Sequence, residues 1–286
     1  MIAQLSPFTT LNTDYQQFLK ALETSGFRGE ISADYASRVV LATDNSIYQR
    51  LPQAAVFPRD ADDVALLARL IAEPAYQKVV ITPRGGGTGT NGQSLTDGIV
   101  VDLSRHMNRI LEINVEQRWV RVQAGVVKDQ LNAALKSAGL FFAPELSTSN
   151  RATVGGMINT DASGQGSCTY GKTRDHVLEL HMVLRGGERL HGRPLEDSEL
   201  AAECAREGRV GEVYRCARQI IDEQGELIRE TFPDLNRCLT GYDLAHLREA
   251  DNRFNLNSVL CGAEGSLGFV VEAKLNVLPI PKHTML

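Results

Sequence analysis

Apolar and polar positions follow two different periods along the first hundred residues. Apolar residues three and four positions apart predict an amphipathic helix over residues 13–25 and another over residues 60–71, whose acidic start complements the helix dipole. Short β-branched runs predict strands, at residues 56–58, 78–82 and 99–103. Helices therefore alternate with strands, which indicates a small α/β lobe.

Beyond residue 109 the period changes, and strands dominate. Alternation of apolar and polar residues predicts strands at residues 110–113, 119–122 and 268–278, and a hairpin formed by residues 177–184 and 189–192. A helix is expected over residues 128–138, stopped by a glycine. Residues 195–229 are charged and helical in period, with interruptions near Gly208 and Gly211, and we expect them to lie on the surface.

Composition and charge exclude several classes of protein. The chain has 286 residues, 43% hydrophobic and 23% charged, which is typical of a compact enzyme. No apolar run approaches the roughly 20 residues that span a bilayer, and no signal sequence is evident, so we expect a cytoplasmic protein without a membrane span. The net charge of −5, without a basic block, gives no reason to expect a nucleic-acid partner.

Cysteine and histidine patterns suggest neither disulfides nor a metal site. The five cysteines are odd in number and scattered, without a C-x-x-C pair, so we expect reduced thiols. The six histidines show no metal-ligand spacing in the sequence. We therefore expect no metal and nominate no histidine as a catalytic base.

The most informative segment is a glycine-rich turn that follows the strand at residues 78–82. Five glycines occupy the eight positions from Gly85 to Gly92. Glycine lets a ligand approach the main chain closely, and consecutive N–H groups can converge on an anion. Arg84 and the hydroxyl groups of Thr88 and Thr90 add nearby donors. The sequence therefore predicts a phosphate-binding turn.

Two nucleotide-binding motifs overlap the glycine-rich parts of the chain. Residues 87–92 fit the dinucleotide fingerprint G-x-G-x-x-G, but a strand at residues 99–103 follows where that motif requires a helix. Residues 166–173 fit the P-loop pattern, with Lys172 and Thr173 in the phosphate and metal positions. The flanking segments do not read as the strand and helix that a P-loop needs. A P-loop nucleotide triphosphatase is kept as an alternative function.

Five ordered segments between residues 52 and 281 resemble the FAD-binding domain of the p-cresol methylhydroxylase and vanillyl-alcohol oxidase superfamily. They are residues 83–90, 102–110, 144–147 with 153–164, 170–171, and 262–268. The resemblance implies an α+β fold with two lobes: a small α/β lobe over about 51–105, and a larger lobe over about 106–281 with a mostly antiparallel sheet flanked by helices. It further implies an N-terminal helical extension over 1–50, a helical insertion over about 195–236, and the start of a cap or substrate domain at 282–286.

The resemblance also implies which residues contact FAD. Those expected around the pyrophosphate are Arg84, Gly85, Gly86, Gly87, Thr88, Gly89 and Thr90, with Gly92 turning the loop back. Those expected in the second FAD-contacting loop, on the ribityl and isoalloxazine side, are Pro144, Glu145, Leu146, Ser147, Gly155, Gly156, Asn159, Ser163, Gly164 and Tyr170. Those expected near the adenosine half or the dimethylbenzene edge are Glu264, Gly265, Gly268 and Val270. The first loop has no histidine, so we expect FAD to be bound non-covalently.

Residues 240–244 are similar to the branch that contains D-lactate and D-2-hydroxyglutarate dehydrogenases. Membership of this branch implies oxidation of a D-2-hydroxy acid to the 2-oxo acid by hydride transfer to flavin N5. The carboxylate clamp and base would then lie beyond Leu286, so we assign no catalytic residue here and expect these residues alone to be inactive. The insertion resembles long bacterial members with an iron-sulfur module after the flavoprotein part. The substrate, the electron acceptor and the oligomeric state stay open, and a non-catalytic flavin-binding module is a further alternative.

Overall fold

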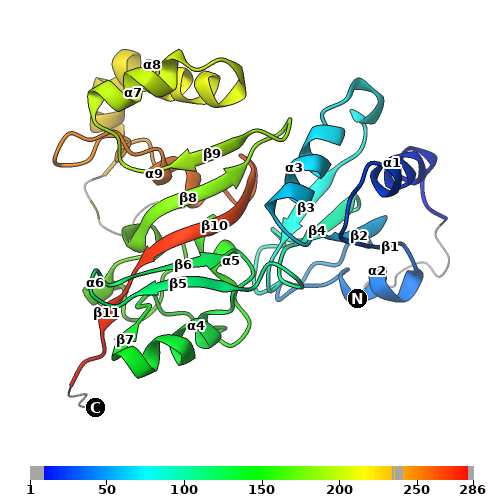
Figure 1. Ribbon diagram of the computed structural model, residues 1–286, viewed down its shortest axis with the longest axis horizontal. Coiled ribbons are helices and arrows are strands. Elements are labelled where there is room, and N and C mark those ends of the chain that lie inside the picture. Colours follow the sequence, from blue (N-terminus) through cyan, green and yellow to red (C-terminus); the bar gives the residue numbers. More distant parts are fainter. Residues whose placement is uncertain (1–9, 234, 236–240, 283–286) are drawn as a thin grey trace.

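The computed structural model describes residues 10–233, 235 and 241–282, which form two lobes built on two separate sheets (Figure 1). Outside these residues lie the first nine positions of the expected extension, the end of the expected insertion, and all but Lys282 of the expected domain start at 282–286. Cys238, Thr240 and His283 lie outside them as well. In the described residues, no helix has both the length and the apolar character needed to cross a membrane.

The small lobe contains a four-stranded sheet with helices packed against it. Its strands are β1 (Glu30–Ser32), β2 (Ala54–Phe57), β3 (Ile81–Arg84) and β4 (Ile99–Asp102), in the order β1-β2-β4-β3. Its helices are α1 (Thr13–Thr24), α2 (Tyr35–Val40), α3 (Ala61–Leu70) and a short 3-10 helix, Pro74–Tyr76. Strands β2, β4 and β3 are parallel, whereas β1 is antiparallel to β2. The two predicted helices are confirmed as α1 and α3.

Two expectations for the small lobe need correction. The N-terminal segment is not merely a helical extension, because β1 pairs with β2 and α1 buries Phe18 and Leu22 in the main core. The expected buried strand at residues 78–82 begins at Ile81 instead. Val80 is half exposed, and its backbone N–H donates to the hydroxyl group of Tyr15 rather than to a neighbouring strand.

The larger lobe contains a five-stranded sheet in which every neighbouring pair is antiparallel. Its strands are β5 (Ile110–Asn114), β6 (Trp119–Gln123), β8 (Val177–Val183), β9 (Arg189–Gly192) and β10 (Phe269–Asn276), in the order β5-β6-β10-β8-β9. A small two-stranded sheet joins β7 (Leu140–Phe141) to β11 (Leu278–Pro279). The predicted hairpin is confirmed as β8 and β9, and the α+β fold with a mostly antiparallel second sheet is confirmed.

Helices flank this sheet and complete the lobe. They are α4 (Lys128–Leu135), α5 (Val154–Asn159), α6 (Ser167–Tyr170), α7 (Asp197–Ala205), α8 (Gly208–Thr231), α9 (Asn257–Leu260) and the 3-10 helices Lys136–Ala138 and Thr173–His176. Helices α7 and α8 lie beside β9 at the sheet edge (Figure 1). The helical segment is interrupted before Gly208 as expected, since α7 ends at Ala205 and α8 begins at Gly208, but Gly211 lies inside α8. The inner face of α8 buries Val210 and Tyr214, so the expected surface excursion is partly core.

One continuous apolar core joins the two lobes. It extends from Phe18 in α1 to Val277 after β10. The turn between β8 and β9 also reaches the small lobe, where the N–H of Gly186 donates to the backbone oxygen of Ala68 in α3. The lobes are therefore held in a fixed relation, and the loops between them form the walls of one cleft.

Candidate functional site

A cleft of about 370 Å³ lies between the lobes. A volume of this size falls within the range of ligand pockets, roughly 300–1,000 Å³. Many of the predicted residues line it: Arg84, Gly85, Gly86, Gly87, Thr88, Gly89, Thr90, Leu146, Gly155, Gly156, Asn159, Ser163, Glu264, Gly265 and Val270. The fold thus brings together three segments that are far apart in the sequence.

Other predicted residues do not line the cleft: Gly92, Pro144, Glu145, Ser147, Gly164, Tyr170 and Gly268. Two of them have visible supporting roles. A Cβ atom on Gly164 would overlap the backbone oxygen of Glu145, so this glycine allows two loops to meet. The ring of Tyr170 packs edge-on against Phe141, with centroids 5.6 Å apart. Direct contact of these residues with a ligand stays a prediction.

Several lining residues were not predicted: Pro83, Gln93, Ser94, Leu103, Ala124, Thr148, Ala152, Thr153, Met157, Thr160 and Ala162. Thr153 had a local signal, because a threonine before a helical run is a favoured N-cap, and its Oγ1 accepts from the N–H of Gly156 at 3.3 Å. Gly85 leaves room for this side chain, since a Cβ atom there would overlap Thr153 Oγ1. Most of the others lie in or next to segments that carry the family resemblance, whereas Ala124 is distant from them in the sequence.

The glycine-rich loop offers a row of unused donors. It spans residues 85–98. Because β3 and β4 are parallel, the chain must cross back to the start of β4, and here it does so without a helix. Within the described part of the chain, the backbone N–H groups of residues 85–90 donate no hydrogen bond. Gly87 and Gly92 have φ values of 61° and 79°, which glycine adopts without strain. Such a set of free N–H groups is suited to an anion.

Arg84 stands behind this loop and holds it. Its guanidinium group donates to the backbone oxygens of Leu41 at 3.4 Å and Thr43 at 2.8 Å, and to Ser94 Oγ at 3.4 Å. Burial lowers the pKa of this guanidinium group, whereas the carboxylates of Asp102 and Asp44 act in the opposite direction. An arginine stays charged at neutral pH under such conditions. The structure thus indicates a supporting cation, and the predicted direct phosphate contact stays a prediction.

Asn159, at the end of α5, fastens the last cleft-lining turn. Its Nδ2 donates to the backbone oxygen of Gly155 at 2.7 Å, and its Oδ1 accepts from the N–H of Gly265 at 2.9 Å. Its backbone oxygen accepts from the N–H of Glu264 at 2.8 Å. Glu264 has a φ of 49°, an uncommon value for a residue with a side chain, so this contact helps to hold a strained turn.

A buried ionic cluster lies next to the cleft, because Asp161 falls between the lining residues Thr160 and Ala162. Asp161 Oδ2 lies 2.9 Å from Lys172 Nζ and 2.6 Å from Arg174 Nε, and Arg174 also pairs with Asp243. Both aspartate side chains are 1% exposed. Lys172 is therefore paired with the buried carboxylate of Asp161. Residues 166–173 contain the short helix α6 and, after two residues without regular structure, the start of the 3-10 helix Thr173–His176, not a strand, loop and helix, so the P-loop interpretation is wrong.

Cys261 is fully buried beside this ionic cluster. Burial raises the pKa of its thiol far above the usual value, with Asp161 acting in the same direction. Cys168 and Cys216 are exposed. Because the thiolate is the reactive form, we expect iodoacetamide to label Cys168 and Cys216 in the folded protein, and Cys261 only after unfolding. Peptide mapping by mass spectrometry measures this, and rapid native labelling of Cys261 would contradict the packing described.

Comparisons with known proteins agree with this geometry. Residues 52–193 match the protein family described as FAD binding domain. The chain is 78% identical to D-2-hydroxyglutarate dehydrogenase of Pseudomonas putida over 100% of its length, and 55% identical to that of Escherichia coli over 99%. It spans 28% of the length of each of these relatives. Glycolate oxidase subunit GlcD of Bacillus subtilis is 32% identical over 88% of the chain, which covers 43% of that protein.

Solved structures share the fold at low identity. An alkyldihydroxyacetonephosphate synthase superposes with a TM-score of 0.66 at 19% identity, covering 96% of this chain and 42% of that one. The 6-hydroxy-D-nicotine oxidase of Arthrobacter nicotinovorans gives a TM-score of 0.59 at 19% identity, covering 89% and 43%. The two-lobed architecture is therefore common to proteins with very different sequences.

Proposed function

We propose that the cleft between the two lobes holds FAD, because residues 52–193 match the family described as FAD binding domain. The observation that carries the proposal is the row of unbonded N–H groups at residues 85–90. A diphosphate offers several strong acceptors and negative charge, which such donors satisfy. A ligand that carries phosphate groups therefore explains why a cleft loop leaves its amides without partners.

The glycine-rich loop would bind the diphosphate of FAD. The backbone donors of residues 85–90 are supplemented by the hydroxyl groups of Thr88 and Thr90, which also line the cleft. Arg84, held behind them, contributes positive charge without needing to move. Fixed donors cost little reorganisation when the ligand arrives, because the folded loop has already placed them.

The apolar part of the cleft lining would receive the flat ring system. It includes Leu146, Met157 and Val270, together with Gly156, where a small residue lets a ring approach the backbone. When bound, FAD supplies an acceptor for a hydride from a substrate carbon. The apolar wall excludes water from that position. Neither histidine nor cysteine lines the cleft in the described residues, so we propose non-covalent binding.

We further propose that the whole protein oxidises a D-2-hydroxy acid, with D-2-hydroxyglutarate as the first candidate, because of the names of the most similar relatives. The charged side chains that line the cleft within the described residues are Arg84 and Glu264. Arg84 already donates its hydrogen bonds to the protein, the shortest of them to the backbone oxygen of Thr43. We therefore assign no substrate clamp or base to this chain. Electrons would leave for a separate acceptor, and an iron-sulfur centre farther along a longer polypeptide is one candidate.

The four described cysteines are free thiols, which suits a reducing compartment, and we propose a cytoplasmic location.

The substrate proposal is tested by anaerobic reduction of the bound flavin. D-2-hydroxyglutarate should bleach the absorption of FAD near ~450 nm in a protein of the relatives' full length, and the L enantiomer should not. We expect residues 1–286 alone to bind FAD and to show little bleaching. Rapid bleaching of flavin bound to residues 1–286 alone would overturn the assignment of the clamp and base to the rest of a longer protein. Equal bleaching by both enantiomers would overturn the proposed substrate.

Arg84→Ala tests the supporting role of the cation behind the loop. Loss of three hydrogen bonds to the 41–44 segment and Ser94 should loosen the loop and weaken FAD binding by about tenfold, or about 1.4 kcal/mol. Arg218→Ala is the matched control, because Arg218 is 51% exposed on α8. FAD titration of both variants measures the effect, and equal affinities would argue against this role.

A further inference from the structure

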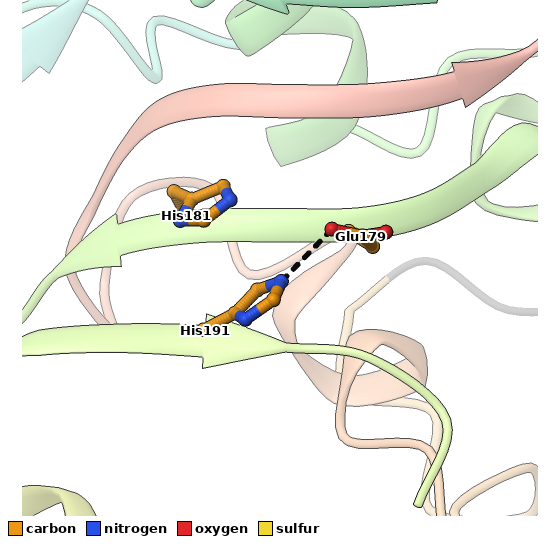
Figure 2. Close-up of side chains that lie close together, drawn as sticks. All are labelled: Glu179, His181 and His191. Atoms are coloured by element: carbon orange, nitrogen blue, oxygen red, sulfur yellow. Dashed lines mark hydrogen bonds and ion pairs between the residues drawn. The ribbon is translucent and has the colours of Figure 1, made fainter. Parts of the chain in front are cut away.

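Three potential metal ligands lie together on the large sheet, outside the cleft. They are Glu179 and His181 on β8 and His191 on β9, shown in Figure 2. His191 Nε2 lies 3.0 Å from Glu179 Oε2, and the two imidazole rings stack with centroids 4.3 Å apart. One ligand atom from each residue falls within 4.8 Å of the others. None of the three residues lines the cleft.

The strand geometry explains why the three side chains meet. Glu179 and His181 are two positions apart on β8, so their side chains point to the same face of the sheet. His191 stands directly opposite His181 in the antiparallel register. Cross-strand neighbours have Cβ atoms about 5 Å apart. The two histidines are ten positions apart in the sequence, which is why spacing alone did not reveal the cluster.

Two of the potential ligand residues, His181 and Glu179, already accept hydrogen bonds from cationic side chains. Arg121 Nη1 lies 3.1 Å from His181 Nε2, and since arginine can only donate, that nitrogen is the acceptor. Lys274 Nζ donates to Glu179 Oε1 at 2.8 Å. The cluster therefore already attracts positive charge. Both cationic side chains remain partly exposed, at 28% and 21%, so they can turn towards solvent.

We propose that Glu179, His181 and His191 form a binding site for a divalent first-row transition metal ion, with Zn²⁺ as the reference ion. Two imidazoles and one carboxylate suit zinc and its neighbours, whereas calcium and magnesium prefer oxygen ligands. A water molecule would complete a tetrahedral site. The ion would replace Arg121 and Lys274 as partners of these ligands and fasten β8 to β9. Glu272, opposite His181 in the register, adds a second acidic residue nearby.

Isothermal titration of the purified protein with ZnCl₂ tests the site. We expect one ion per chain, with His191→Gln and Glu179→Gln each weakening Zn²⁺ affinity by more than about tenfold. His191 is 43% exposed, so its substitution should leave the fold intact, and a thermal melt checks this. His106→Gln is the matched control, because His106 also contacts a carboxylate, Glu30, at 2.8 Å. That variant should bind Zn²⁺ as tightly as the wild type.

The absorption spectrum of the Co²⁺-loaded protein separates this site from adventitious binding by thiols. Nitrogen and oxygen ligands should give weak visible bands that disappear in His191→Gln. Strong near-ultraviolet charge transfer would instead indicate thiolate ligation, by an exposed cysteine such as Cys168 or Cys216. Absence of Zn²⁺ binding, unchanged affinity in His191→Gln, or thiolate bands would overturn the proposal. FAD content is expected to stay the same in every variant.

Discussion

Gly86→Ala is expected to yield a protein that no longer retains FAD. A Cβ atom at this position would overlap the backbone oxygen of Arg151 and lie 2.9 Å from its carbonyl carbon. Backbone atoms cannot move aside as a flexible side chain can, so the glycine-rich loop itself must shift and its donors diverge. We expect FAD affinity to fall by about 100-fold, or about 2.8 kcal/mol, in a titration followed by flavin fluorescence.

Gly225→Ala is the control for this substitution. Gly225 lies inside α8, where a new Cβ atom would meet nothing closer than Arg229 Nη1 at 3.6 Å. Alanine is the better helix former by about 1 kcal/mol, so this variant should be at least as stable as the wild type and keep its FAD affinity. If Gly86→Ala bound FAD as tightly as Gly225→Ala, the loop would not be the phosphate site.

Asp161→Asn is expected to destabilise the fold by about 3–5 kcal/mol, because breaking a buried pair leaves its partner charges uncompensated. Asp161 is the shared partner of Lys172 and Arg174, and both cations are largely buried. Its φ of 45° is one that asparagine also tolerates, so the substitution changes the charge and little else. Urea unfolding, fitted for the free energy of unfolding, measures the effect.

Asp222→Asn provides the comparison with an exposed pair. Asp222 lies 3.5 Å from Arg218 on α8, and both side chains are more than half exposed. An ion pair of this kind contributes about 0–1 kcal/mol. A free energy of unfolding for Asp161→Asn within 1 kcal/mol of that for Asp222→Asn would show that the buried cluster does not stabilise the fold as described.

Elements with strong local signals were predictable from the sequence. The helices α1 and α3 carry caps at Asn12 and Asp60 and a clear apolar stripe, and the structure contains both. The hairpin of β8 and β9 followed from alternation around a glycine turn. The glycine-rich loop was recognisable because so many glycines between two strands have few uses besides close approach to a ligand.

Features that depend on contacts distant in the sequence could not be predicted. Strand β1 joins the small sheet through pairing with β2. Its three residues are only half buried, so their sequence does not predict a strand. Arg84 looked like a phosphate ligand, whereas its bonds to Leu41 and Thr43 depend on where the 41–44 segment folds. The meeting of His181 and His191 depends on the register of two strands, which no spacing rule encodes.

The central claim is that the amides around Gly86 bind the diphosphate of FAD. The most direct measurement is the titration of FAD-free protein with FAD, followed by the absorption of the bound flavin near ~450 nm. Saturable binding of one FAD per chain, lost in Gly86→Ala and kept in Gly225→Ala, is the predicted result. A protein that stays colourless after incubation with excess FAD, with no saturable change in the titration, would contradict it.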